Sequence, residues 1–303
     1  MAATWIDLLD PNEEELRAQA PRKLQEPALE LMLAHSRHDD EPRPTMQSHG
    51  DYIFGIFLLA RAIPEENRIY YQEVDVVIAD DTILTVRKTP ADGREPYDLG
   101  PLREAVHDSD TPGMIAYRLV DAIAEAYLDV VDDIDAEIDE LDDRVEEQAA
   151  EQTRLRISEL RHDLLHVRRT LAPMRDAVRS VVDNVVEVKQ GPEVFTHDVE
   201  IAFSSAYDKL LRALDGLEFS RDLLSSVRDY HQSKIANDQN EVMKRLTVIA
   251  ALILLPTFIV GLYGQNFVNM PELKWHYGYA YSWGLIVATT IIQLWFFRRK
   301  RWI

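Results

Sequence analysis

Two uncharged, apolar segments near the end of the chain constrain its fold more than any other feature. They read LTVIAALILLPTFIVGL over residues 246–262 and YSWGLIVATTIIQLWFF over residues 281–297. Each would be about 26 Å long as a helix, at roughly 1.5 Å per residue, which is close to a hydrocarbon core of about 30 Å. We therefore predict two transmembrane helices; the alternative is a buried helical hairpin in a soluble core.

The residues around these segments favour a membrane and indicate an orientation. Aromatic residues crowd the start of the second segment and Trp295 lies at its end, which is typical of the two membrane interfaces. The outer loop, residues 263–280, carries only Glu272 and Lys274 as charges. The other flanks hold the basic residues Lys244, Arg245, Arg298, Arg299, Lys300 and Arg301. The positive-inside rule then predicts a multi-pass protein of the cell's plasma or inner membrane, with both termini cytoplasmic. The polar, acidic first 20 residues resemble no cleaved signal peptide.

Composition limits what the rest of the chain can do. Its 53 acidic and 33 basic residues give a formal net charge of -20, so it lacks the basic footprint of a nucleic-acid-binding protein. The absence of cysteine excludes disulfides, thiolate nucleophiles and Cys-ligated metal centres. No glycine-rich phosphate loop or nucleophile elbow occurs, and His162 and His166 have the zincin spacing without its Glu. We expect neither an enzyme, nor an ATP-driven pump, nor an organic cofactor.

Residues 1–112 have the pattern of a small cytoplasmic α/β domain. Acidic runs and prolines over residues 1–48 predict short helices and loops. Three stretches rich in Ile, Val, Tyr and Phe predict strands, at residues 52–60, 68–79 and 82–87. Ala79-Asp80-Asp81 between the last two looks like a hairpin turn. We expect a small sheet packed with helices.

Residues 113–245 are predicted to be helical. Apolar residues at spacings of three and four indicate one helix to about Ala150 and another from about Gln152 to Val188, an antiparallel pair within 113–190. Residues 121–151 hold fourteen acidic residues and one basic residue, Arg144. Two interpretations stay open: a solvated helix face, or a cytoplasmic surface that concentrates divalent cations.

A long stalk helix, residues 195–245, follows the break at Gly191-Pro192 and leads into the first membrane segment. Because two membrane helices cannot enclose an aqueous path, transport would need several copies around an axis. Steps of three and four along this helix give a stripe of small and polar residues: Asp229, Ser233, Ala236, Asn240, Met243, Thr247, Ala250, Leu254, Thr257 and Gly261. The stripe fits a narrow pore lining, and equally the close packing of helices through small residues.

The end of the chain resembles the CorA family of divalent-cation channels. The resemblance rests on Tyr263-Gly264-Gln265-Asn266-Phe267 directly after an apolar helix, then Met270-Pro271-Glu272-Leu273, a second apolar segment and a basic C-terminus. It is strong over residues 205–303 and weaker over the rest. It implies an α+β domain, long stalk helices and two C-terminal transmembrane helices, assembled as a homopentameric funnel whose first membrane helix lines the pore.

The resemblance also implies residue roles. Asn266 would form an outer selectivity ring for a hydrated cation, with Gly264 and Gln265 completing the loop. Asn240, Met243, Thr257 and Gly261 match pore-facing positions, and Asp229 matches an acidic ring in the stalk. Glu272 in the outer loop would attract cations. Because Mg²⁺ dehydrates reluctantly, carboxamide oxygens that contact its bound water would select the hydrated ion.

Two positions depart from the family pattern. Gln265 stands where the family has Met, which adds polarity beside the filter and bears on the preference for magnesium. Ser205 stands where some relatives carry a sensing Asp, so Asp80, Asp81 and Asp208 are the fallback candidates for a regulatory Mg²⁺ site.

The resulting hypothesis is passive transport of Mg²⁺, with Co²⁺ or Ni²⁺ as further cargo. A ZntB-like zinc transporter on the same scaffold is the nearest alternative. A membrane-anchored helical scaffold without conduction is the alternative from another class.

Overall fold

The computed structural model describes residues 3–35, 41–63, 68–146, 149–188, 193–266 and 269–303. The chain divides into two compact units, Met1–Arg228 and Asp229–Ile303. The predicted Gly191-Pro192 break and Phe267 of the filter motif lie outside the described residues.

Within the described residues, the first unit holds a mixed sheet of five strands. Their bounds are β1 Thr4–Leu9, β2 Thr45–Ser48, β3 Ile53–Ile63, β4 Arg68–Ala79 and β5 Thr82–Arg87. The strand order is β1-β5-β4-β3-β2, in which β1 and β5 are parallel and the other neighbours are antiparallel. The three strands predicted from sequence are confirmed with small shifts in their bounds.

The β4–β5 connection is the predicted tight hairpin. Ala79 pairs with Thr82, which leaves Asp80 and Asp81 as the turn. Asp80 has φ +49°, in the left-handed region that Asp tolerates better than most residues other than glycine.

The prediction of short helices and loops over residues 1–48 is wrong in part. α1 (Glu13–Gln19) and α2 (Glu26–Leu33) are present, but β1 and β2 also fall in this stretch. β1 pairs with β5, with Thr4 opposite Thr82. A partner this distant in sequence supplies the strand's hydrogen bonds, so local composition does not reveal it.

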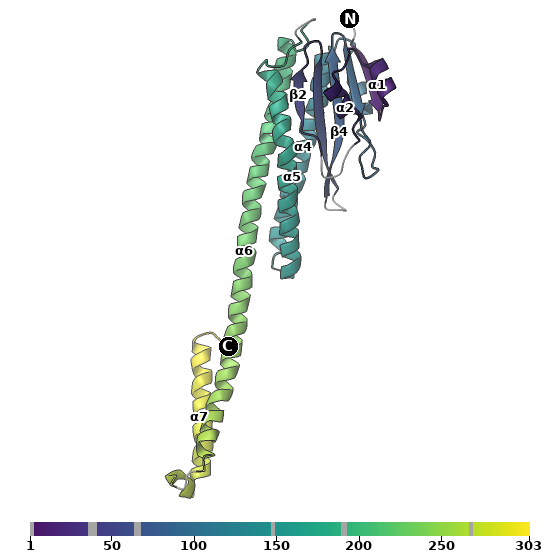
Figure 1. The fold of residues 1–303 in the computed structure, drawn as a ribbon. Coiled ribbons are helices and arrows are strands. Elements are labelled where there is room, and N and C mark those ends of the chain that lie inside the picture. Colours follow the sequence, from purple (N-terminus) through teal and green to yellow (C-terminus); the bar gives the residue numbers. More distant parts are fainter. Residues whose placement is uncertain (1–2, 36–40, 64–67, 147–148, 189–192, 267–268) are drawn as a thin grey trace. The chain divides into compact units, whose positions relative to one another are not determined.

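Helices cover both faces of the sheet (Figure 1). Leu29 and Met32 of α2 share one buried cluster with Val77 and Leu84 of the sheet. The other face packs against α4 (Pro112–Arg144) and α5 (Ala150–Val182), in the larger cluster. A short helix, α3 (Gly100–Glu104), lies between β5 and α4 in the chain. The α+β prediction is confirmed.

Caps explain where α4 begins and where α5 ends. The Thr111 side chain accepts a hydrogen bond from the Met114 amide at the start of α4, with Pro112 at a first-turn position. α4 ends at Arg144 rather than Ala150, and α5 ends at Val182 rather than Val188. Asn184, at φ +56°, terminates α5 because its left-handed backbone cannot continue the helix.

The chain then forms a single helix of 67 residues, α6 (His197–Tyr263). At about 1.5 Å per residue it is about 100 Å long. A 3-10 turn, Pro271–Lys274, and α7 (Gly278–Arg299) follow. The C-terminal part of α6 and α7 are each long and apolar enough to cross a membrane, and their most apolar windows are 11% and 6% buried. Within the chain, these two helices therefore do not form the buried hairpin of a soluble core.

Candidate pore helix and filter loop

One face of the apolar part of α6 packs against α7, which runs alongside it (Figure 1). Val248 and Ile259 are buried, and Gln293 Nε2 of α7 donates a hydrogen bond to the main-chain oxygen of Ala251 at 3.0 Å. These positions follow the spacing of one helix face. The contact with α7 therefore assigns one side of α6 to the second membrane helix.

The polar stripe lies on a different side of α6. At about 100° per residue, its members turn away from the face that contacts α7. All ten residues from Asp229 to Gly261 are exposed in the single chain. Nothing within 4 Å would meet a Cβ placed on Gly261. The stripe is therefore open to solvent, lipid or further copies of the chain.

The two threonines of the stripe donate their hydroxyl protons to the helix itself. Thr247 Oγ1 donates to the Met243 carbonyl at 2.8 Å, and Thr257 Oγ1 donates to the Ile253 carbonyl at 2.7 Å. Each hydroxyl oxygen consequently keeps its lone pairs for an outside donor. In a pore these would be acceptors for the water around a cation.

The filter motif follows directly on the end of α6. The Gly264 amide still donates to the Val260 carbonyl at 2.9 Å, and a Cβ on Gly264 would lie 3.1 Å from that oxygen. Gly264, Gln265 and Asn266 are all exposed. The carboxamide residues Gln265 and Asn266 therefore lie beyond the end of the helix and are exposed.

The outer loop re-enters α7 through a close turn. A Cβ on Gly278 would lie 2.3 Å from the Glu272 carbonyl, so this approach requires glycine. The rings of Trp275 and Tyr281 lie 5.5 Å apart. Glu272 is exposed within this loop.

The fallback metal candidates do not meet in one cluster within the described part of the chain. No group of three or more His, Asp or Glu side chains there is placed to hold a metal ion. Asp80 forms an ion pair with Arg22, Asp81 accepts a hydrogen bond from Thr82, and Asp208 is exposed on α6. These assignments remain predictions.

The acidic stretch of α4 has a buried apolar side and an exposed acidic side. Some of its acids pair within the chain: Lys209 Nζ lies 2.9 Å from Asp121 and 2.8 Å from Glu125. Asp132, Asp133 and others are exposed. This arrangement agrees with a solvated face, and does not by itself indicate cation binding.

His162 and His166 stack on α5 with ring centroids 6.0 Å apart. His166 Nε2 lies 3.2 Å from Glu41 Oε2. Among the described residues, the pair belongs to no group of three or more His, Asp or Glu side chains placed to hold a metal ion.

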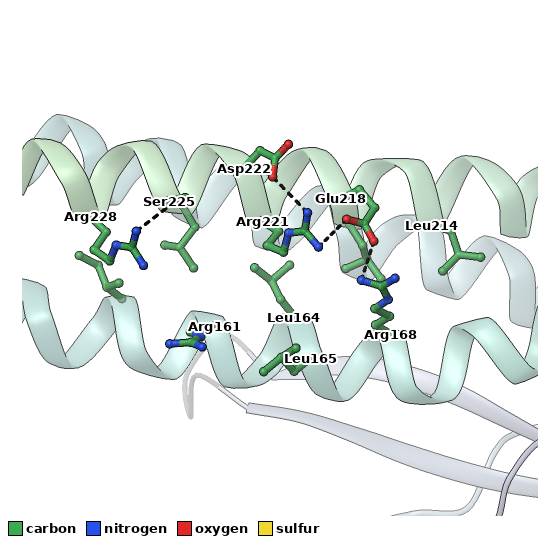
Figure 2. Close-up of a pocket in the computed structure, with 13 residues that line it drawn as sticks. Arg161, Leu164, Leu165, Arg168, Leu214, Glu218, Arg221, Asp222, Ser225 and Arg228 are labelled. Atoms are coloured by element: carbon green, nitrogen blue, oxygen red, sulfur yellow. Dashed lines mark hydrogen bonds and ion pairs between the residues drawn. The ribbon is translucent and has the colours of Figure 1, made fainter.

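Sequence analysis missed a groove between α5 and α6, with a cavity volume of about 300 Å³ (Figure 2). Leu164 and Leu217 line it beneath a network in which Glu218 contacts Arg168 of α5 at 2.6 Å and Arg221 of α6 at 2.8 Å. The network bridges the two helices across the groove. Charged residues repeating beside leucines on both helices are the only sequence signal for it.

It also missed a buried charged cluster under α2. Lys88 Nζ contacts Glu73, lies 3.1 Å from Asp75 Oδ2 and donates to the Leu31 carbonyl at 2.7 Å. Asp75 is fully buried. Burial raises its pKa well above the ordinary range, and the neighbouring Glu73 carboxylate adds to the effect. Two acids one residue apart in an apolar strand were the available signal.

An α+β domain, a long helix that continues into the first of two candidate membrane spans, and an exposed polar stripe along that helix together fit the class of membrane transport proteins. A profile of the CorA-like Mg²⁺ transporter protein family matches residues 2–299, and the chain belongs to this family.

Individual relatives agree with this assignment. The cobalt/magnesium transport protein CorA of Thermotoga maritima is 28% identical over 267 residues, covering 86% of this chain and 73% of the relative. The protein of that name from Methanocaldococcus jannaschii is 24% identical over 301 residues, covering 99% and 91%. The complete structure of the M. jannaschii CorA magnesium transporter superposes with a TM-score of 0.80 at 22% identity, covering 99% and 91% of the two chains.

Proposed function

We propose that the chain transports divalent metal cations passively, Mg²⁺ first and Co²⁺ or Ni²⁺ as further cargo. The observation that carries the proposal is the stripe on α6, exposed along its whole length from Asp229 to Gly261 on a side that α7 does not cover. It leads to the exposed carboxamides of Gln265 and Asn266. A polar stripe inside a membrane is costly unless it faces water or protein.

In the proposed assembly, five copies surround an axis and each contributes its α6 stripe. The number five comes from the family resemblance. Asn240, Met243, Thr257 and Gly261 would line the pore, Asp229 would form an acidic ring below it, and Asn266 an outer ring. Symmetry would then turn each polar residue into a ring of donors and acceptors around the ion.

The Asn266 ring would act on a hydrated ion. Mg²⁺ holds its six oxygen ligands tightly and releases water reluctantly, so carboxamide oxygens accepting from that water bind it without stripping it. The threonine oxygens left free by their backbone hydrogen bonds would serve in the same way further along. Glu272 would raise the local cation concentration at the mouth.

The proposed topology has both termini and the whole of residues 1–245 in the cytoplasm. We divide this region into an α/β domain, residues 1–112, and helices, 113–245, with a transmembrane domain over 246–303. We also propose that cations bound between the acidic domains of neighbouring copies hold the pore closed. Their loss would leave like charges to repel, and the pore would open.

Flux into proteoliposomes tests the function. Purified full-length protein is reconstituted, a potassium diffusion potential is imposed, and Mg²⁺ entry is followed with a trapped indicator while Co²⁺, Ni²⁺ or Zn²⁺ competes. We expect Mg²⁺ entry that grows with inside-negative potential, because the potential contributes about 2.3 kcal/mol per charge per 100 mV. Entry of Zn²⁺ without Mg²⁺ would support the ZntB-like alternative, and absence of any flux the scaffold alternative.

A further inference from the structure

The end of α7 carries a dense basic cluster that the transport proposal does not use. Together with the basic residues before the apolar part of α6, it forms what we call the basic collar: Lys244, Arg245, Arg298, Arg299, Lys300 and Arg301. All six are exposed. Among the described residues, Arg245 pairs with Glu241 at 3.3 Å, and the four residues on α7 and its tail have no acidic partner. The collar therefore has a large uncompensated positive charge in a chain of net charge -20.

A single hydrogen bond sets the two halves of the collar at one level. Gln293 Nε2 on α7 donates to the carbonyl of Ala251 on α6 at 3.0 Å. The helices run antiparallel, and each residue advances both by about 1.5 Å. Arg299 and Lys300, which follow Gln293, therefore lie level with Arg245 and Lys244, which precede Ala251.

The chain end is folded in a defined cap. The Arg301 amide donates to the Arg298 carbonyl at 3.1 Å, and the Trp302 amide donates to the Phe297 carbonyl at 3.0 Å. Arg301 has φ +55°, the position that glycine usually occupies in this Schellman motif. The Trp302 and Phe297 rings stack with centroids 5.8 Å apart. The cap therefore fixes the backbone of Arg301 directly beyond the end of α7.

Apolar side chains border the collar on its membrane side. Leu246, Trp295 and Phe296 are 55%, 60% and 49% exposed. The Arg299 guanidinium lies over the Trp295 ring, 5.4 Å from its centroid. An amphipathic edge of this kind fits a ligand with a phosphate head and a hydrocarbon tail better than a soluble anion.

We propose that the basic collar binds the phosphate group of an anionic phospholipid, with the acyl chains against the apolar border. Several charged N–H donors at one level can engage a phosphate and its neighbours together. Juxtamembrane lysines and arginines attract anionic headgroups in the same way. The inference rests on the proposed membrane orientation and is independent of which cation is carried.

Native mass spectrometry of the full-length protein in mild detergent tests this proposal. Equal amounts of phosphatidylglycerol and phosphatidylcholine are offered, and retained lipid is counted. We expect preferential retention of phosphatidylglycerol, lost in the variant R298Q/R299Q/K300Q/R301Q and kept in K23Q/R154Q/R161Q/R169Q, which removes the same charge from exposed positions of the first unit. Equal retention of both lipids, or equal loss in both variants, would overturn the proposal.

Two further arms keep the result interpretable. Arg301→Gly keeps the left-handed cap and removes one charge, so it should fold as well as the native protein and weaken phosphatidylglycerol binding about fivefold, with Arg301→Lys restoring it. Millimolar inorganic phosphate should not displace the lipid; full displacement would identify a simple anion site and refute the lipid assignment. Because retention is measured without flux, a protein that binds lipid but carries no cation would refute only the transport proposal.

Discussion

Gln293 of α7 donates its side-chain amide to the main-chain oxygen of Ala251 on α6, at 3.0 Å. This polar contact joins α7 to the apolar part of α6, and it sets the register of the two helices. Hydrogen bonds of this kind between membrane helices contribute about 0.6 kcal/mol on average. We expect Gln293→Leu to lower the stability of the detergent-solubilised protein by about that amount, measured by unfolding in SDS. Ile292→Leu, at an exposed neighbouring position, should change nothing; an equal effect would deny the bond this role.

Asn266→Ala should abolish Mg²⁺ flux into proteoliposomes while the assembly stays intact by size-exclusion chromatography. The reason is that alanine removes the oxygen that would accept from the ion's water, while the change falls on an exposed loop residue. The matched control is Asn269→Ala, the same change at another exposed position of the loop. Unchanged flux in Asn266→Ala would remove the filter assignment.

Gln265→Met should raise the ratio of Mg²⁺ to Co²⁺ flux. It restores the residue found in the family motif and removes a second carboxamide beside the proposed ring. One hydrogen bond to ion-bound water is worth about 1 kcal/mol, or about a fivefold change in the ratio. Competition between the two ions in the same vesicles gives the ratio directly, and a fall in it would contradict the proposed role of Gln265.

Stability should depend on pH through Asp75. Burial and the neighbouring Glu73 raise the pKa of Asp75 above the unfolded value of about 4. The contribution of Asp75 to folding stability is therefore complete below the unfolded pKa and is lost as pH rises through the raised folded-state pKa. We expect Asp75→Asn to gain stability relative to the native protein between pH 4 and pH 7, measured by thermal unfolding. Asp222→Asn, at an exposed position, should follow the native protein throughout.

Lys88→Met should destabilise the protein at pH 7 by about 3–5 kcal/mol, because it leaves two buried carboxyls without their counter-charge. Lys88 is 4% exposed, and the two carboxylates raise its pKa although burial opposes this. At acidic pH the carboxyls protonate and the cost should shrink. A loss that is the same at pH 4.5 and pH 7 would mean that packing, not charge, dominates at this position.

Gly216→Ala should destabilise the first unit by about 1–3 kcal/mol, as overpacking does. A Cβ at Gly216 on α6 would lie 2.7 Å from Cγ1 of Val131 on α4, a β-branched side chain that has little room to move. Gly284→Ala, where nothing lies within 4 Å, is the matched control. Thermal unfolding compares the two, and equal melting temperatures would disprove the close contact.

Sequence reasoning predicted the elements whose pattern lies within a short stretch of the chain. The two apolar segments, the strands of the β4–β5 hairpin and the length of α6 follow from composition and period within short windows. It failed at β1, because the hydrogen-bond partner of this strand, β5, is distant in the chain. It also placed the ends of α4 and α5 too far along the chain; α5 ends where Asn184 adopts a left-handed conformation.

For the candidate site, periodicity singled out the stripe on α6 but left its role open between a pore lining and a packing face. The residues that face α7 are set by a contact with another helix, here through Gln293 and Ala251, which periodicity cannot predict. The placement of Lys88 between Glu73 and Asp75 likewise depends on a contact between neighbouring elements, which periodicity cannot predict.

The sequence by itself determined that this chain has a large acidic part and two short apolar spans, because hydrophobicity and charge are properties of each residue and its near neighbours. Its family motif indicated the transporter class. Only the tertiary structure decided which side of α6 is covered by α7 and which side stays exposed. It also decided which strands pair and which carboxylates are buried away from water. Those outcomes depend on contacts between segments far apart in the chain, whose energies no local pattern contains.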